Sequence, residues 1–268
     1  LDGKYFPDLM VQEAKQVIEK KSVEPFFMFF AMNTPHYPYQ GYAKWIKYYR
    51  DKGVKHPRDL YAAFLTTQDE KIGELISLLE KNNLRDNTII IFQSDNGHST
   101  ETRAYHGGGF TGPFRGAKQC LFEGGIRVPA AISWPGKIPS NQFRDQISVN
   151  VDWMPTLIEL CDFNTDTSDM DGKSLLPIIN NKKASSNHEM GYCWEFNWKG
   201  KISWVARKGK WKLYRNPYDT GRRNYTYTEK FVLFDLENDP GESVNLYDQK
   251  PNIVYELKSL YRNWKNKQ

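Results

Sequence analysis

The side chains best suited to bind a cation follow a short apolar run. Residues 88–93 read Thr-Ile-Ile-Ile-Phe-Gln, and Ser94, Asp95, Asn96 and Gly97 come directly after them. Asp95 and Asn96 offer one charged and one neutral oxygen ligand, which suit Ca²⁺ or Mg²⁺. An Asp-Asn-Gly sequence is also an ordinary loop turn, since the glycine allows a sharp change of direction. The tripeptide alone therefore leaves a metal site and a plain turn as alternatives.

A histidine and a lysine add chemistry for an anionic ester. His36 stands between two prolines after the apolar run 26–32, so a stiff, extended loop should hold it. Lys118 lies on the loop that follows Asp95 and Asn96. If the apolar runs are strands of an open α/β sheet, ligands bind at their carboxyl ends. There, a metal and a lysine would hold the oxygens of an anion, and a histidine could donate a proton.

The loop 97–116 is rich in glycine and carries three further polar side chains, His98, Arg103 and His106. Its three consecutive glycines are not a P-loop, because the strand–GxxxxGK–helix context is missing. We expect this loop to form a flexible or tightly folded rim of the site. Structural roles for the two histidines remain the alternative.

Apolar periodicity predicts the α/β framework that would position these residues. Three short apolar runs, 26–32, 88–93 and 128–134, predict strands buried on both faces, as in a parallel sheet. Residues 8–21 and 59–83 have helical spacing, with Asp8 as the expected cap of the first helix. Helix followed by strand, twice over, predicts a mixed sheet flanked by helices.

The last part of the chain has a different pattern. Short, aromatic and partly alternating segments predict an antiparallel sheet, and residues 251–265 predict a closing helix. The expected strands lie at 190–196, 202–208, 211–214 and 231–235. We therefore expect two domains, with residues 1–186 in the α/β part and residues 187–268 in a small antiparallel-sheet and helix subdomain.

Composition excludes several classes of function. The 268 residues have 39% hydrophobic content, enough to bury a core, and a net charge of +5 with dispersed basic residues. The mild positive charge would attract an anionic substrate. No nucleic-acid-binding signature and no apolar run of membrane-spanning length occurs, so neither nucleic acid nor membrane is expected as a partner. Cys120, Cys161 and Cys193 form no CxxC pair, which argues against a zinc or redox motif.

The order of these motifs resembles that of the type I sulfatases, members of the alkaline-phosphatase superfamily. The matching segments are 25–38, 94–97, 115–118, 123–129, 152–156, 171–175, 209–213 and 233–246. The resemblance implies a sulfatase-like fold, with Asp95 and Asn96 as calcium ligands. It also implies that His36 and Lys118 act on the sulfate group as catalytic residues, and that the protein is periplasmic or secreted.

The sequence departs from the family pattern in one respect. Sulfatases have an N-terminal half with an Asp-Asp metal pair and a Cys-x-Pro/Ala-x-Arg motif, whose cysteine becomes the formylglycine nucleophile. None of the three cysteines here has that context. The chain therefore resembles the C-terminal part of a sulfatase, with about half of the metal ligands. We expect it to be inactive alone, to have an exposed sheet edge, and to need the missing N-terminal half as its partner.

The expected substrate is a sulfated carbohydrate. The loop 98–109 followed by Arg115-Gly-Ala-Lys118 is most similar to carbohydrate sulfatases, so His98, Arg103 and His106 are expected to contact a glycosaminoglycan or mucin-type sugar sulfate. Two alternatives remain. A phosphodiesterase-like member of the superfamily is disfavoured because such sites use two metals with several histidines. The other alternative is a non-catalytic, glycan-binding fragment.

Overall fold

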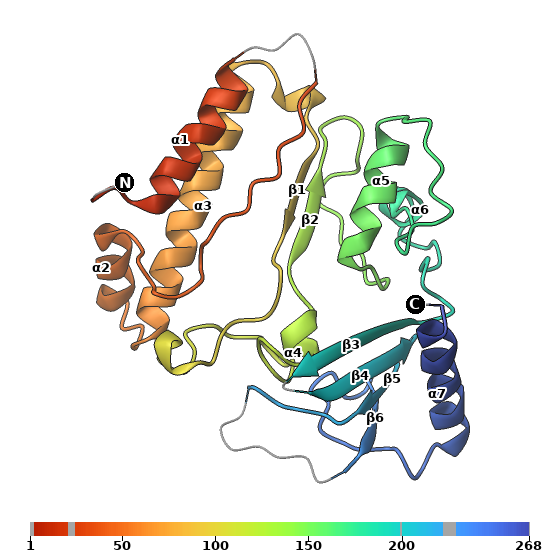
Figure 1. Ribbon diagram of the computed structural model, residues 1–268. Helices are drawn as coiled ribbons and strands as arrows, with labels where there is room; N and C mark the ends of the chain where they lie inside the picture. Colours follow the sequence, from red (N-terminus) through yellow and green to blue (C-terminus); the bar gives the residue numbers. More distant parts are fainter. Residues whose placement is uncertain (1–2, 21–24, 199, 222–228, 268) are drawn as a thin grey trace. The chain divides into compact units, whose positions relative to one another are not determined.

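The chain folds as two units, each with its own sheet (Figure 1). The computed structural model describes residues 3–20, 25–198, 200–221 and 229–267. The first unit consists of Leu1–Gly112 and Val128–Trp134, and the second of Pro113–Arg127 and Pro135–Gln268. The predicted boundary between residues 186 and 187 falls within the second unit and stays a prediction.

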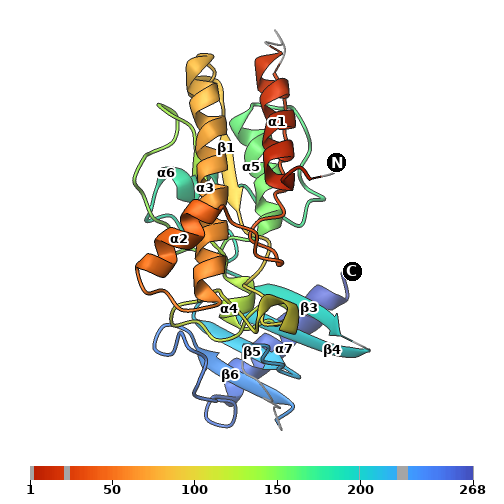
Figure 2. The same ribbon diagram turned by 90° about the vertical axis from the view of Figure 1, so that its left-hand side faces the viewer.

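The first unit contains three helices and a two-stranded sheet. The helices are α1 (Phe6–Glu19), α2 (Ala43–Asp51) and α3 (Arg58–Lys81), and the strands are β1 (Ile90–Gln93) and β2 (Ala130–Ser133). Helices α1 and α3 lie side by side in both views (Figures 1 and 2). Their packing buries the apolar stripe that α1 presents at helical spacing, Val11, Ala14 and Ile18. Both long helices are thus confirmed.

Two predictions about the first helix and the first sheet were wrong. Tyr5 is the N-cap of α1, and Asp8 lies in its first turn, where its carboxylate binds the Lys71 ammonium at 2.8 Å. Strands β1 and β2 pair antiparallel, with Ile91 opposite Ile132, rather than in a parallel sheet. The Asp8 carboxylate therefore pairs with Lys71 of α3 and does not cap α1.

The apolar run 26–32 was predicted to be a buried strand, and that was wrong. The structure assigns it no strand, and the side chains of Phe27 and Phe29 are 81% and 84% exposed. Phe92 on β1 is also exposed, at 42%. An apolar run predicts burial only if neighbouring strands cover it. Within the described residues, this sheet consists of β1 and β2 alone.

The second unit is built on a four-stranded antiparallel sheet in the order β3-β4-β5-β6. Its strands are β3 (Tyr192–Trp198), β4 (Lys201–Lys208), β5 (Trp211–Arg215) and β6 (Phe231–Asp235). Its helices are α4 (Glu123–Ile126), α5 (Trp153–Leu160), α6 (Leu176–Asn180) and α7 (Pro251–Lys265). The predicted C-terminal sheet and closing helix are therefore confirmed.

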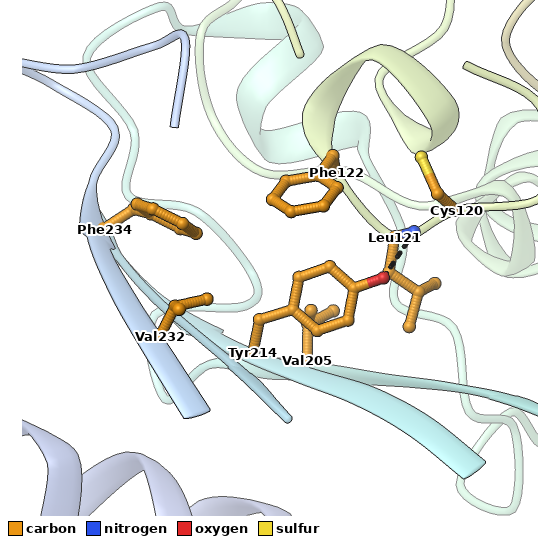
Figure 3. Packing of buried hydrophobic residues seen from close by; sticks show 7 residues of the cluster. All are labelled: Cys120, Leu121, Phe122, Val205, Tyr214, Val232 and Phe234. Atoms are coloured by element: carbon orange, nitrogen blue, oxygen red, sulfur yellow. Dashed lines mark hydrogen bonds between the residues drawn. The ribbon is translucent and has the colours of Figure 1, made fainter. Parts of the chain in front are cut away.

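Alternation along the strands of this sheet produces two buried faces. Ala206, Leu213 and Leu233 face α7, which packs against them through Val254 and Leu257. The opposite face is shown in Figure 3, where Val205, Tyr214, Val232 and Phe234 meet Cys120, Leu121 and Phe122. The Tyr214 hydroxyl accepts a hydrogen bond from the Leu121 backbone N–H at 3.1 Å. This sheet therefore anchors the segment that carries Lys118.

Short 3₁₀ turns complete the described elements: Arg85–Asn87, Thr102–Ala104 and Asn150–Asp152. Among the described helices, not one combines the length and the apolar character that crossing a bilayer requires.

Candidate active site

The turn after β1 is fixed by hydrogen bonds on both sides. The Ser94 N–H donates to the Pro129 carbonyl at 3.1 Å, which extends the pairing of β1 with the start of β2. The Asn96 N–H donates to Asp95 Oδ1 at 2.9 Å, and the Asn96 Nδ2 donates to the Gly97 carbonyl at 2.9 Å. Because the amide nitrogen of Asn96 is engaged, its oxygen is the atom suited to ligate a cation. The Asp95 side chain is exposed to solvent.

This turn fits a hard cation by its chemistry and supplies only part of a coordination shell. A carboxylate and an amide oxygen are ligands that Ca²⁺ takes, but Ca²⁺ needs six to eight oxygens. In the described part of the chain, no group of three or more His, Cys, Asp or Glu side chains is arranged to hold a metal. Further ligands would have to come from other groups.

His36 lies exposed in the loop predicted to hold it. Its Nδ1 is 2.8 Å from the Tyr37 carbonyl oxygen, and the two rings pack with their centroids 4.4 Å apart. Since a carbonyl only accepts, Nδ1 carries the hydrogen in this contact. A neutral His36 ring then has its lone pair on Nε2. The prolines on either side, Pro35 and Pro38, both follow cis peptide bonds.

Glu101 joins the His36 loop to the loop after Asn96, and sequence reasoning missed it. Its Oε2 accepts hydrogen bonds from the Tyr37 hydroxyl and from the Ser99 hydroxyl, each at 2.9 Å. Its backbone carbonyl accepts from the N–H groups of Ala104 and His106, at 2.9 Å and 3.0 Å. One residue thus connects the two loops that carry His36 and His106. A single glutamate in a polar loop gave no sequence signal for this role.

His98 is packed into the triple glycine. A Cβ on Gly109 would lie 2.2 Å from the His98 Cβ, and one on Gly108 would lie 2.5 Å from the Tyr61 Cβ. Burial, aided by the nearby Arg58 guanidinium, lowers the pKa of His98. The Arg58 guanidinium also donates to the Gly108 carbonyl at 2.8 Å. Of the two predicted forms of this loop, the tightly folded one is observed here.

Arg103 and His106 are both exposed, on the 3₁₀ turn Thr102–Ala104 and just after it. His106 has a left-handed backbone, with φ at 62°. The hydrogen bond to Glu101 raises the pKa of Tyr37, and the positive charge of Arg103 partly offsets that effect. Arg103 therefore lies close enough to the His36 loop to act on it electrostatically.

Lys118 belongs to the second unit and lies half-buried on a tight turn. Its carbonyl accepts a hydrogen bond from the Thr220 hydroxyl at 2.6 Å. Gly116 before it and Gln119 after it have left-handed φ values of 89° and 71°. The first of these conformations is one that glycine adopts without strain.

Buried ion pairs hold the segment around Lys118 on the sheet. Lys212 is fully buried and lies 2.9 Å from Glu123 and 2.8 Å from Glu242. Burial alone would raise the pKa of Glu123, but Lys212 and Arg207 lower it below its ordinary value. Burial raises the pKa of Glu242. The motif that begins at Glu123 is thus anchored through its carboxylate.

Arg115, at the start of the same segment, makes comparable contacts. Its guanidinium donates to the Asp219 carboxylate and to the Glu242 carbonyl, both at 2.7 Å, and lies over the Phe122 ring. A further buried polar contact lies elsewhere in this unit. The His188 ring contacts the fully buried Asp152 carboxylate at 2.9 Å. Arg115, Glu123 and Asp152 each begin a segment that resembles the sulfatases, and these contacts show that all three residues have structural roles.

Comparison with known proteins agrees with this architecture. Residues 2–163 match the sulfatase family, and residues 114–267 match the family described as N-sulphoglucosamine sulphohydrolase, C-terminal. Human arylsulfatase D is 28% identical over 257 residues, which cover 88% of this chain and 42% of that protein. Human N-acetylgalactosamine-6-sulfatase is 33% identical over 174 residues, which cover 64% of this chain and 32% of that protein.

Solved structures support the same conclusion. The crystal structure of Ps i-CgsB in complex with k-i-k-neocarrahexaose has a TM-score of 0.84 and 25% identity, and covers 97% of this chain and 55% of that one. The PsFucS1 sulfatase from Pseudoalteromonas sp. shares the fold, with a TM-score of 0.67 and 20% identity, over 97% of this chain and 51% of that one. The chain spans less than half the length of the curated relatives named here. Because the sulfatase match extends over more than half of its residues, the chain belongs to the sulfatase family.

Proposed function

We propose that this chain is part of a sulfuric ester hydrolase that acts on sulfated carbohydrate, to which it contributes metal-binding and sulfate-binding residues. The observation that carries the proposal is the hydrogen-bonded unit in which Glu101 connects the His36 loop to the loop after Asn96. The proposed cation ligands and the His36 imidazole thus belong to segments that hydrogen bonds connect. Such preorganisation is what stabilisation of a developing negative charge requires.

Each proposed site residue has a role that its chemistry supports. Asp95 and Asn96 would hold Ca²⁺, with Mg²⁺ as the alternative ion. A bound cation would supply positive charge to the sulfate oxygens. When its ring is protonated on both nitrogens, His36 would donate from Nε2 to an ester oxygen, and Lys118 would bind a sulfate oxygen through its ammonium group.

The proposed substrate is a glycosaminoglycan or mucin-type sugar sulfate. One named relative is an N-acetylgalactosamine-6-sulfatase, and one similar structure holds k-i-k-neocarrahexaose. His98, Arg103 and His106 would contact the sugar. Arg103 and His106 are exposed, and the tight packing of His98 supports a role in shaping the loop as well. By the same family likeness, we propose a periplasmic or secreted protein.

We also propose that an N-terminal half of the same domain supplies the formylglycine nucleophile and the remaining metal ligands. The exposed phenylalanines Phe27, Phe29 and Phe92 support this partner, because a large exposed apolar surface is typical of a site that another segment or protein covers. The 268-residue chain alone should therefore not hydrolyse an aryl sulfate. Turnover above background by the purified chain would overturn this part of the proposal.

Ligand binding can be measured without turnover. We expect N-acetylgalactosamine 6-sulfate, added with CaCl₂, to shift the ¹⁵N NMR signals of His36 and Asn96, while the unsulfated sugar does not. Asp95→Ala should abolish the effect of calcium, and Asp69→Ala, which removes an exposed aspartate of α3, should not. Equal shifts with the sulfated and unsulfated sugars would contradict the proposed function.

A further inference from the structure

The second unit has a groove of about 420 Å³ along α7 that none of the predicted site residues lines. Its walls come from α7 and from the turn just before this helix. They are formed by Tyr247, Asp248, Pro251, Val254, Tyr255, Lys258 and Arg262. The groove thus combines two aromatic rings, two cations and one carboxylate.

An aromatic ring and two cations are aligned along the helix. Tyr255, Lys258 and Arg262 are three and then four residues apart, so they share one face of α7. Together they extend over about 10 Å of helix, at 1.5 Å per residue. The Tyr255 side chain is 70% exposed, which leaves its ring accessible to a ligand.

The two cations are held differently. The Lys258 ammonium donates to the Tyr247 hydroxyl at 2.6 Å and lies 4.2 Å from the centre of the Phe231 ring. These contacts fix the lysine in place, so less conformational entropy is lost when a ligand binds. The Arg262 guanidinium is exposed and, over the ranges that the structure describes, has no hydrogen bond or ion pair. Its planar fork remains available for a bidentate oxyanion contact.

We propose that this groove is a second binding site for sulfated carbohydrate. Lys258 and Arg262 would bind sulfate oxygens, and the Tyr255 ring would pack against the apolar face of a sugar. Asp248 would accept hydrogen bonds from sugar hydroxyl groups. The choice of a sulfated carbohydrate as the ligand rests on the proposed function, whereas the existence of a binding site is inferred from the groove and the residues that line it. Two cations beside an exposed ring are complementary to a sulfated sugar and less so to a neutral one.

The test is calorimetric titration of the 268-residue chain with a chondroitin 6-sulfate hexasaccharide. We expect the single variant Tyr255→Ala to weaken binding roughly tenfold, the loss of one aromatic contact, and the double variant Lys258→Ala/Arg262→Ala to weaken it by more than about tenfold, because it removes two charge-assisted contacts. Lys137→Ala and Phe143→Ala are matched controls, since both remove exposed side chains of the same unit. They should bind like the parent chain.

Three results would overturn the proposal. These are unchanged affinity in the groove variants, equal binding of the unsulfated hexasaccharide, and complete competition by inorganic sulfate at the same concentration, which would indicate a simple anion site. NMR keeps this test separate from that of the proposed function. Shifts at Tyr255 report the groove, and shifts at His36 and Asn96 report the proposed active site.

Discussion

At the level of single residues, the most informative contact is the hydrogen bond from Tyr37 to Glu101. Because the carboxylate accepts a hydrogen bond from the phenol, it favours the protonated form and raises the pKa of Tyr37. Glu101→Gln removes the negative charge while keeping the size of the side chain. We therefore expect the pKa of Tyr37 to fall in this variant, as measured by NMR titration of its ring signals.

The control for this substitution is Glu70→Gln on α3. Glu70 accepts hydrogen bonds from Lys44 and Trp45 and does not contact Tyr37. The Glu70→Gln substitution should therefore leave the pKa of Tyr37 unchanged. A Tyr37 pKa that is the same in Glu101→Gln and in the parent chain would show that this hydrogen bond is not made in solution.

His98 should make stability depend on pH. Its pKa is lowered in the folded chain by burial and by Arg58, so the unfolded chain binds more protons near the ordinary histidine pKa of about 6.5. The free energy of unfolding should therefore fall as the pH drops through about 6.5, and the loss should level off below the folded pKa. His98→Gln should flatten this fall between about pH 7.5 and pH 5, as measured by urea denaturation.

His106→Gln provides the comparison, because His106 is exposed on the same loop. It should retain the pH dependence of the parent chain. The same slope in His98→Gln and His106→Gln would refute the assignment to His98.

At this scale, sequence reasoning identified residue types but not their contacts. Asp95, Asn96 and His36 were chosen because they follow apolar runs. Glu101 and Tyr37 were missed because their contact joins residues 64 positions apart, and spacing along the chain has no signal for such a pair.

At the level of elements, the three consecutive glycines 107–109 allow the loop that follows β1 to pack closely against itself and against α3. A methyl group on Gly109 would lie 2.2 Å from the His98 Cβ, closer than real Cβ atoms approach, so the loop would have to move. Gly109→Ala should destabilise the chain by about 1–3 kcal/mol, the usual cost of overpacking. The measurement is the free energy of unfolding in urea.

Gly73→Ala is a control of opposite sign. Gly73 lies within α3, and an added Cβ would have nothing within 4 Å. Since alanine favours helix, this variant should be more stable by roughly 0.5–1 kcal/mol. If Gly109→Ala and Gly73→Ala have the same free energy of unfolding, Gly109 does not pack closely against His98 in solution.

The ion pairs between α4 and the C-terminal sheet should be essential to the second unit. Lys212 is fully buried between Glu123 and Glu242, so Lys212→Met would remove the cation that these two buried carboxylates share. Removing one partner of a buried ion pair typically costs 3–5 kcal/mol, about the loss we expect in urea denaturation.

Lys210→Met is the matched control on the neighbouring turn. Lys210 contacts Asp235 and Glu237 near the surface, where water screens the charges, so its removal should have a much smaller effect. Equal losses in the two lysine variants would mean that burial does not strengthen the Lys212 contacts.

Helices and antiparallel strands were predictable because their signals are local. The periodicity of residues 59–83 and 251–265 gave α3 and α7, and alternating aromatics gave β3 to β6. The run 26–32 was misjudged because its burial depends on neighbouring strands, which local sequence cannot describe.

At the level of the whole molecule, the exposed apolar surface of the first unit should limit solubility. The side chains of Phe27 and Phe29 are more than four-fifths exposed, and such surfaces promote self-association. Phe27→Ser/Phe29→Ser should reduce the apparent mass of the chain at high concentration, measured by light scattering. Phe143→Ser removes a single phenylalanine of the second unit that is 91% exposed. It should have no such effect, because apolar residues scattered singly on a surface are normal and do not form an adhesive patch. Association unchanged by the double variant would exclude this surface as its cause.

The order in which the two units use the chain bears on how the protein is made. Strand β1 pairs with β2, which is reached only after the polypeptide has passed through residues 113–127 of the other unit. On the ribosome, the first sheet cannot close until residue 133 has emerged. A gene cut anywhere between these two strands would separate β1 from its partner, so neither unit can be expressed as one uninterrupted stretch.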